Sequence, residues 1–221
     1  FLQKTYDVND IIFYDDFFFF NISSTENEIK DFCDELSRRD IHMSWQIEVR
    51  VDWLTQINPN GVHMLEECGC RQINVGIEKT NPIGQEYLGK TFSVGALSDA
   101  VQLVKHHSKI RIAGTFILGG KDENQERILN EIDASKNLGI DFAHFNPLFI
   151  YPGTNIYYQR FRGQRDWLKY ILEDSLPWGE IVYENESIDR DTLIELTERA
   201  YRTFYAGTEY EAEEMVLDRF N

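Results

Sequence analysis

The sequence has little positive charge and no long apolar run. Its 221 residues include 22 Lys and Arg against 38 Asp and Glu, which gives a formal net charge of -16. Binding to nucleic-acid phosphates needs a basic surface, so this composition argues against a nucleic-acid partner. The densest apolar stretch, residues 11–20, is interrupted by Asp15 and Asp16 and is shorter than the roughly 20 residues of a membrane span. We therefore expect neither nucleic-acid binding nor a membrane segment.

Cysteine is scarce as well, with only Cys33, Cys68 and Cys70 in the chain. Three cysteines are too few for a disulfide scaffold at this length, and the first residues show no leader-like apolar segment. We therefore predict three buried thiols in a reduced, cytoplasmic protein. The histidines form no H-x-H or H-E-x-x-H pair, so no metal site is predicted.

What the sequence does contain is enough apolar material for a core and a regular alternation of two periodicities. Hydrophobic residues make up 42% of the chain and aromatic residues 14%. Short β-rich runs alternate with stretches that repeat apolar residues every three or four positions, which predicts parallel strands joined by crossover helices and an α/β fold. The five predicted strands cover residues 10–13, 45–51, 72–77, 111–118 and 142–150.

The alternation weakens after Pro152, Gly153 and Thr154. One clear helical stripe remains further on, at Leu193, Leu196, Ala200 and Phe204. The sequence therefore predicts an α/β domain over residues 1–158 and a mainly helical C-terminal appendage over residues 159–221.

Polar residues and glycines cluster where the predicted strands end. In parallel α/β folds the carboxyl ends of the strands share one edge, and binding sites are built from the loops there. The candidates at this edge are Asp15, Asp16, Arg50, Asp52, Glu78, Gly119 and Glu123.

A second motif competes for a functional role. Residues 84–91, from Gly84 to Lys90 and Thr91, match the phosphate-binding pattern G-x-x-x-x-G-K-[ST]. Against a nucleotide site, six residues separate the motif from the preceding strand, and Tyr87 and Leu88 are bulky for a loop that wraps phosphates. A P-loop nucleotide-binding protein remains the alternative function, beside a domain that only binds or assembles.

Seven short motifs follow one another along the first two thirds of the chain. They are Ile12 to Phe18, Trp45 with Arg50-Val51-Asp52, Met64 to Cys70, Asn74-Val75-Gly76-Ile77-Glu78, Leu88-Gly89-Lys90, Thr115 to Gly119 with Glu123, and Tyr151-Pro152-Gly153-Thr154. In this order and spacing they resemble the barrel of radical SAM enzymes over residues 8–158. Within that family the resemblance is strongest to a subgroup that often carries a cobalamin-binding domain and includes anaerobic magnesium-protoporphyrin monomethyl ester cyclases and related methyltransferases.

The resemblance implies a partial (βα) TIM-like barrel of about five βα units, matching the second to sixth strands of the family. Members hold a 4Fe-4S cluster through a C-x-x-x-C-x-x-C motif, which these 221 residues lack. We therefore expect a fragment whose cluster-binding segment is missing, with no cluster and no activity of its own. An unpaired edge on its first strand would favour self-association.

The resemblance also implies roles for the candidate residues in binding S-adenosylmethionine. The segment around Asp15 and Asp16 would face the methionyl amino group, Arg50 the methionyl carboxylate, and Glu78 the ribose hydroxyls or the amino group. Gly119 would let the backbone approach adenine, and Glu123 would order the following loop.

Three of these roles have a structural alternative. The aspartates would cap a turn, Arg50 would pair with Asp52 or Glu48, and Glu123 would stabilise the start of a helix.

By the same resemblance, the intact protein uses S-adenosylmethionine, a 4Fe-4S cluster and, in part of the subgroup, cobalamin. An external electron donor drives cleavage to methionine and a 5′-deoxyadenosyl radical. The radical would act on a small-molecule or tetrapyrrole-like substrate.

Overall fold

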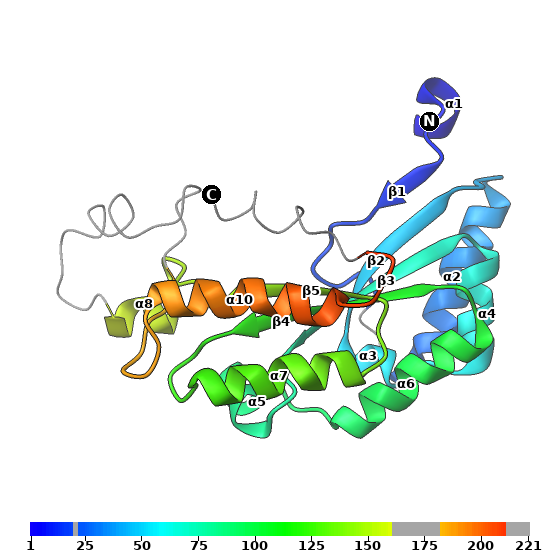
Figure 1. Ribbon diagram of the computed structural model, residues 1–221. Helices are drawn as coiled ribbons and strands as arrows, with labels where there is room; N and C mark the ends of the chain where they lie inside the picture. The colour runs from blue at the N-terminus through cyan, green and yellow to red at the C-terminus, as the bar shows by residue number, and fades with distance from the viewer. Residues whose placement is uncertain (20–21, 161–181, 211–221) are drawn as a thin grey trace. The chain divides into compact units, whose positions relative to one another are not determined.

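The computed structural model describes residues 1–19, 22–160 and 182–210, and within them the chain forms a five-stranded sheet with flanking helices (Figure 1). The strand order is β1-β2-β3-β4-β5, and the pairs from β1 to β4 are parallel. A doubly wound sheet reverses its order part-way, whereas this order follows the chain, which is the topology of a (βα) barrel. The strands are β1 (Asp10–Ile12), β2 (Ser44–Arg50), β3 (Cys70–Glu78), β4 (Arg111–Leu118) and β5 (Phe142–Pro147).

Helices separate successive strands, as the α/β prediction required. Several begin at side chains that accept a hydrogen bond from the first turn: Asn58 caps α4, Ser93 caps α6 and Asp189 caps α10. The helices are α1 (Leu2–Tyr6), η1 (Ile22–Ser24), α2 (Thr25–Arg38), α3 (Val51–Leu54), α4 (Pro59–Glu67), α5 (Pro82–Tyr87), α6 (Val94–His107), α7 (Gln125–Asn137), α8 (Asn155–Arg160) and α10 (Arg190–Tyr205). None of the helices in the described ranges is both long and apolar enough to span a bilayer.

The centre of the core is formed by buried residues that alternate along β2 and β3. On β2, Trp45, Ile47 and Val49 are buried, while the residues between them are only partly buried. Burial of each such side chain contributes on the order of 1.5–3 kcal/mol, so the alternation sets which face of the strand turns inward. The opposite face has the polar and charged residues, which remain available for a site at the strand ends.

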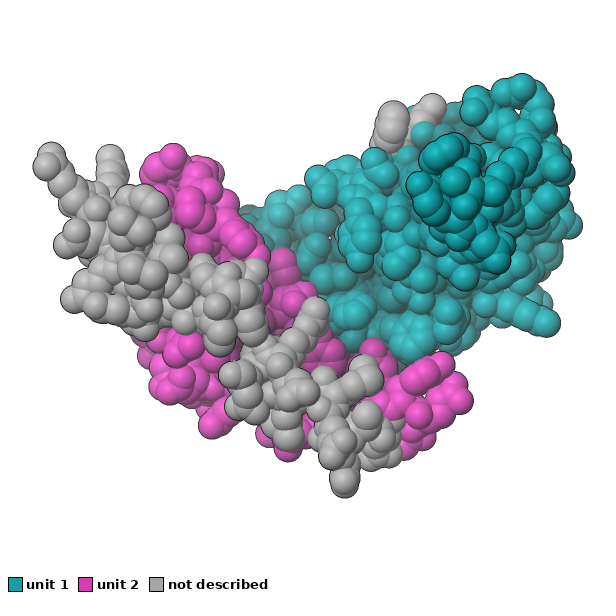
Figure 2. All heavy atoms as spheres, turned by 90° about the horizontal axis from the view of Figure 1, so that it is seen from above, with its two compact units in different colours: residues 1–116, 134–144 teal, residues 117–133, 145–221 magenta. Residues whose placement is uncertain are grey.

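The chain divides into two compact units, which Figure 2 shows in different colours. The first contains residues 1–116 and 134–144, and the second contains residues 117–133 and 145–221. Within the second unit, the Tyr201 hydroxyl on α10 accepts a hydrogen bond from the Phe145 backbone N–H at 3.1 Å. The ring of Phe204, also on α10, packs against the ring of Phe145. The predicted helix in the C-terminal region is confirmed. The predicted boundary at residue 158 stays a prediction, because residues 161–181 lie outside the described ranges.

The cysteine prediction is right for one residue and wrong for two. Cys70 is fully buried, and burial raises the pKa of its thiol to about 12. Cys33 on α2 and Cys68 at the end of α4 are joined by a disulfide. The prediction failed because the two cysteines are 35 residues apart in sequence and meet only when α2 packs beside α4.

Candidate functional site

Glu78 lies in an unusual backbone conformation at the end of β3. Its φ is 66°, in the left-handed region that side chains other than glycine rarely adopt. The register between β3 and β4 shifts between Gly76 and Glu78, so a bulge ends the strand. A left-handed non-glycine residue costs roughly 1–2 kcal/mol, and such strain concentrates at functional sites. The strain makes Glu78 the first candidate of this edge.

Lys90 is the cationic neighbour of Glu78. Its Nζ lies 3.9 Å from Glu78 Oε1 and donates a hydrogen bond of 3.4 Å to the carbonyl of Gly76. A Cβ at Gly76 would come within 3.0 Å of the same Oε1. Glycine at position 76 therefore leaves the space into which the Glu78 carboxylate turns.

Two further carboxylates lie at the ends of the neighbouring strands. Burial raises the pKa of Glu48 on β2, and the negative charge of Asp16 raises it further. Burial also raises the pKa of Glu78; Lys90 opposes this, while Glu48 adds to it. We call Asp16, Glu48, Glu78 and Lys90 the strand-end cluster. With three acidic groups and one basic group, it can accept hydrogen bonds from hydroxyl groups and attract a cationic group.

Asp15 and Asp16 follow β1 in an exposed segment. The segment runs beside β2, because the Phe18 backbone N–H donates to the carbonyl of Glu48 at 3.0 Å. Of the two aspartates, Asp16 is the one whose charge acts on Glu48.

Arg50 ends β2 and is paired with its neighbour Asp52. Its Nε and Nη2 lie 2.8 and 2.6 Å from the two Asp52 oxygens. This pairing lowers the pKa of Asp52, and the guanidinium also lies 5.4 Å from the centre of the Phe17 ring. The ion pair with Asp52, expected as the structural alternative for Arg50, is thus formed. The Arg50 side chain is 48% exposed. Its role toward a ligand stays a prediction.

Gly119 and Glu123 lie in the second unit, in the turn after β4. Gly119 has φ 93°, and a Cβ there would lie 2.7 Å from Leu193 Cδ2 on α10. Asn185 donates to the carbonyls of Gly120 and Glu123 at 2.6 and 2.9 Å. Packing against α10 therefore already requires glycine at position 119. The roles of Gly119 and Glu123 toward a ligand stay predictions.

The P-loop geometry is not formed. Gly84 and Tyr87 lie within helix α5, and the Gly84 N–H is bonded to the Asn81 side chain at 2.7 Å. Lys90, which would reach a phosphate in a P-loop, turns instead toward Gly76 and Glu78. The motif at residues 84–91 therefore has no phosphate cradle.

Sequence reasoning missed three participants. Glu48 alternates with the buried residues of β2, a period-two signal that does mark it as facing away from them. Lys90 was named in two motifs, but no role beside Glu78 was predicted for it. Asn185, more than 60 residues from its partners, has no local signal.

Comparison with curated proteins gives relatives that are enzymes. An uncharacterized methyltransferase of Pyrococcus horikoshii is 27% identical over 208 residues, which is 92% of this chain and 42% of the relative. The anaerobic magnesium-protoporphyrin IX monomethyl ester cyclase of Rubrivivax gelatinosus is 20% identical over 79% of this chain and 30% of that protein. The chain thus spans less than half the length of these relatives. No protein-family profile matches it.

Solved structures show the same architecture. Coproporphyrinogen III oxidase from Escherichia coli, described as a radical SAM enzyme, matches with a TM-score of 0.54 and 12% identity over 81% of this chain and 36% of the other. This is the fold of radical SAM enzymes. The methyltransferase TsrM from Kitasatospora setae, solved with cobalamin and a [4Fe-4S] cluster, matches with a TM-score of 0.54 and 17% identity over 68% of this chain and 28% of the other. At these identities the likeness shows the radical SAM fold and nothing finer.

Proposed function

We propose that this chain is the part of a radical SAM enzyme that binds S-adenosylmethionine at the carboxyl ends of β1, β2 and β3. The observation that carries the proposal is Glu78, a strained carboxylate held beside Lys90 and Glu48. The Glu78 side chain is only 19% exposed, and the charges of Lys90 and Glu48 act on its carboxylate. Its backbone conformation favours a positioned hydrogen-bond acceptor.

The strand-end cluster fits the polar groups of S-adenosylmethionine. Ribose hydroxyls donate hydrogen bonds to a carboxylate, and Glu78 is the least exposed acceptor of the three. The methionyl ammonium group is attracted by Asp16 and Glu48, whose charges already repel each other. Lys90 limits the net charge and orients Glu78.

The described cysteines do not fit a cluster-binding role. Cys70 is buried inside β3, and Cys33 is paired with Cys68. None of the three cysteines is therefore proposed as a ligand of a 4Fe-4S cluster. In the whole protein, an electron from an external donor would cleave S-adenosylmethionine. What this chain contributes is binding and orientation of that molecule.

The relatives suggest the class of reaction. Their names include methyltransferases and a protoporphyrin ester cyclase, so we propose a small-molecule or tetrapyrrole-like substrate, with cobalamin as a further cofactor of the whole protein. The net charge of -16 supports a partner other than nucleic acid, and we retain a cytoplasmic location as a proposal.

We also propose self-association through β1. This strand is outermost in the sheet order, and Ile12 and Tyr14 are 48% and 88% exposed. An unpaired strand edge with apolar neighbours is a template for another chain.

Binding of labelled S-adenosylmethionine, followed by equilibrium dialysis, tests the proposed function. Glu78→Gln should weaken binding about tenfold or more, because a hydrogen bond to a charged acceptor contributes about 1.5–3 kcal/mol. Glu67→Gln is the matched control, since Glu67 is exposed at the end of α4. Equal affinities for the two variants, or no saturable binding by the natural chain, would contradict the proposal.

A further inference from the structure

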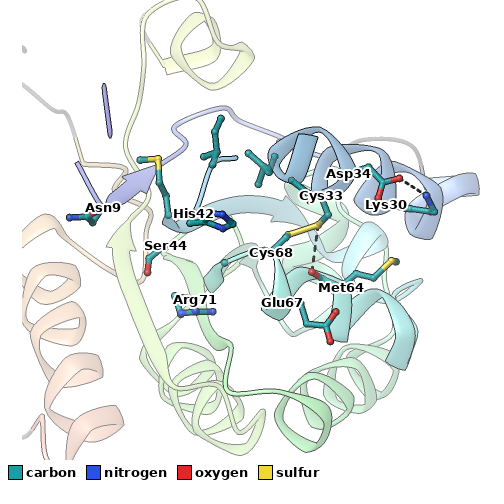
Figure 3. Close-up of a pocket in the computed structure, with 15 residues that line it drawn as sticks. Asn9, Lys30, Cys33, Asp34, His42, Ser44, Met64, Glu67, Cys68 and Arg71 are labelled. Carbon is teal, nitrogen blue, oxygen red and sulfur yellow. Dashed lines mark hydrogen bonds and ion pairs between the residues drawn. A yellow bond between two sulfur atoms is a disulfide. The ribbon is translucent and has the colours of Figure 1, made fainter. Parts of the chain in front are cut away.

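Cys33 and Cys68 lie on neighbouring helices that pack side by side. Cys33 occupies the middle of α2, and Cys68 is the residue that ends α4 (Figure 3). Their Cα atoms are 5.5 Å apart, within the usual range for a disulfide. The two helices thus present the sulfur atoms to each other without any need for backbone movement.

The pair is also open to small molecules. Both cysteines are partly exposed and line a hollow of about 610 Å³, together with Lys30, His42 and Arg71 (Figure 3). Cys70 is the contrast, because its side chain is fully buried and its thiol pKa is raised to about 12. Cys33 and Cys68 therefore line a hollow that a reagent in solution can enter, whereas Cys70 lies in the core.

We propose that Cys33 and Cys68 form a redox-reversible site whose oxidant is a low-molecular-weight disulfide of the glutathione type. The thiolate of one cysteine attacks a sulfur of the oxidant, forming a mixed disulfide and releasing one small thiolate, which takes up a proton. The second cysteine then attacks the mixed disulfide and releases the other small thiol. Two protein thiols lose two electrons and two protons, and one small disulfide becomes two thiols.

The cross-link closes a loop that contains one member of the strand-end cluster, Glu48 on β2. The 35-residue separation between the two cysteines contains the end of α2, all of β2 and α4. Closing this loop reduces the conformational entropy of the unfolded chain. Oxidation should raise the melting temperature by on the order of 5–10 °C. The inference does not depend on the proposed binding of S-adenosylmethionine.

The test starts from the full chain, reduced with dithiothreitol, freed of reductant and incubated with glutathione disulfide. The expected product has lost two hydrogen atoms by mass spectrometry, retains one thiol that a maleimide labels only after unfolding, and melts at the higher temperature. Cys33→Ser and Cys68→Ser should each trap one glutathione as a mixed disulfide, with no rise in melting temperature. Cys70→Ala is the matched control and should behave like the natural chain.

Three free thiols after oxidation would overturn the proposal, as would a bond that includes Cys70 or joins two chains. If Cys70→Ala fails to fold, the natural protein still decides the question. Proteolysis under non-reducing conditions should give one cross-linked pair of peptides, containing Cys33 and Cys68, that separates on reduction. Detection of those peptides only as separate species would also overturn the proposal.

Discussion

The ends of β3 and β4 share a left-handed backbone conformation but have different residues there. β3 ends at Glu78 and β4 is followed by Gly119, and both residues have a positive φ. At Gly119 the structure leaves no room for a side chain, because Leu193 occupies the space. At Glu78 a charged side chain is kept in spite of the backbone strain. Packing against Leu193 therefore explains the glycine at position 119, whereas the charged environment of its carboxylate is what distinguishes Glu78.

The largest expected effect comes from placing a side chain where packing forbids it. Gly119→Ala puts a Cβ 2.7 Å from Leu193 Cδ2 in a conformation with φ 93°. Overpacking and backbone strain together should lower the free energy of unfolding by about 2–4 kcal/mol, measured by urea denaturation. Adding Leu193→Ala should relieve the clash and recover part of the lost free energy of unfolding. A double-mutant cycle that shows no coupling between the two positions would contradict the packing explanation.

The converse change at the other turn should stabilise the protein. Glu78→Gly removes the left-handed strain and should raise the free energy of unfolding by about 1 kcal/mol. The same change should weaken binding of S-adenosylmethionine, as Glu78→Gln does. A variant that loses stability in urea would show that the carboxylate has a structural role, and the contrast between the two turns would fail.

The smallest effect is a dependence of stability on pH. Burial raises the pKa of Glu78 above its ordinary value of 4.5, so the folded state favours the protonated carboxyl. This contribution is fully present below pH 4.5 and is lost as the pH rises through the raised pKa of the folded state. The natural protein should therefore lose stability relative to Glu78→Gln across this range. Unfolding curves of both proteins, measured at each pH, would check this prediction. A difference in the free energy of unfolding that does not change with pH would contradict the burial of Glu78.

Periodicity along the chain predicted most of the local structure. The prediction for residues 111–118 coincides with β4, and the predicted strand at residues 72–77 lies within β3. Such features depend on residues within one or two turns of each other, so a local pattern contains them. The resemblance to radical SAM enzymes also came from short motifs and agrees with the fold.

The candidate site was predicted less completely. Glu78 and Asp16 were named from their place after strands, and both belong to the strand-end cluster. Arg50 was named as well, but whether it binds a ligand or only Asp52 depends on side-chain geometry that no spacing predicts. Glu48 was weighed only as a partner of Arg50. Lys90 was named in the competing phosphate-binding pattern and in the Leu88-Gly89-Lys90 motif of the resemblance, but no role beside Glu78 was predicted for it.

The sequence by itself determined the α/β class, the order of the strands along the chain and the polar character of the strand ends, because these follow from apolar periodicity and turn chemistry. Only the tertiary structure decided which distant residues meet. Cys33 reaches Cys68, Lys90 reaches Glu78, and Asn185 reaches the turn after β4. Each pairing depends on how whole elements pack, and the free energy of packing is distributed over many apolar side chains that individually encode no partner.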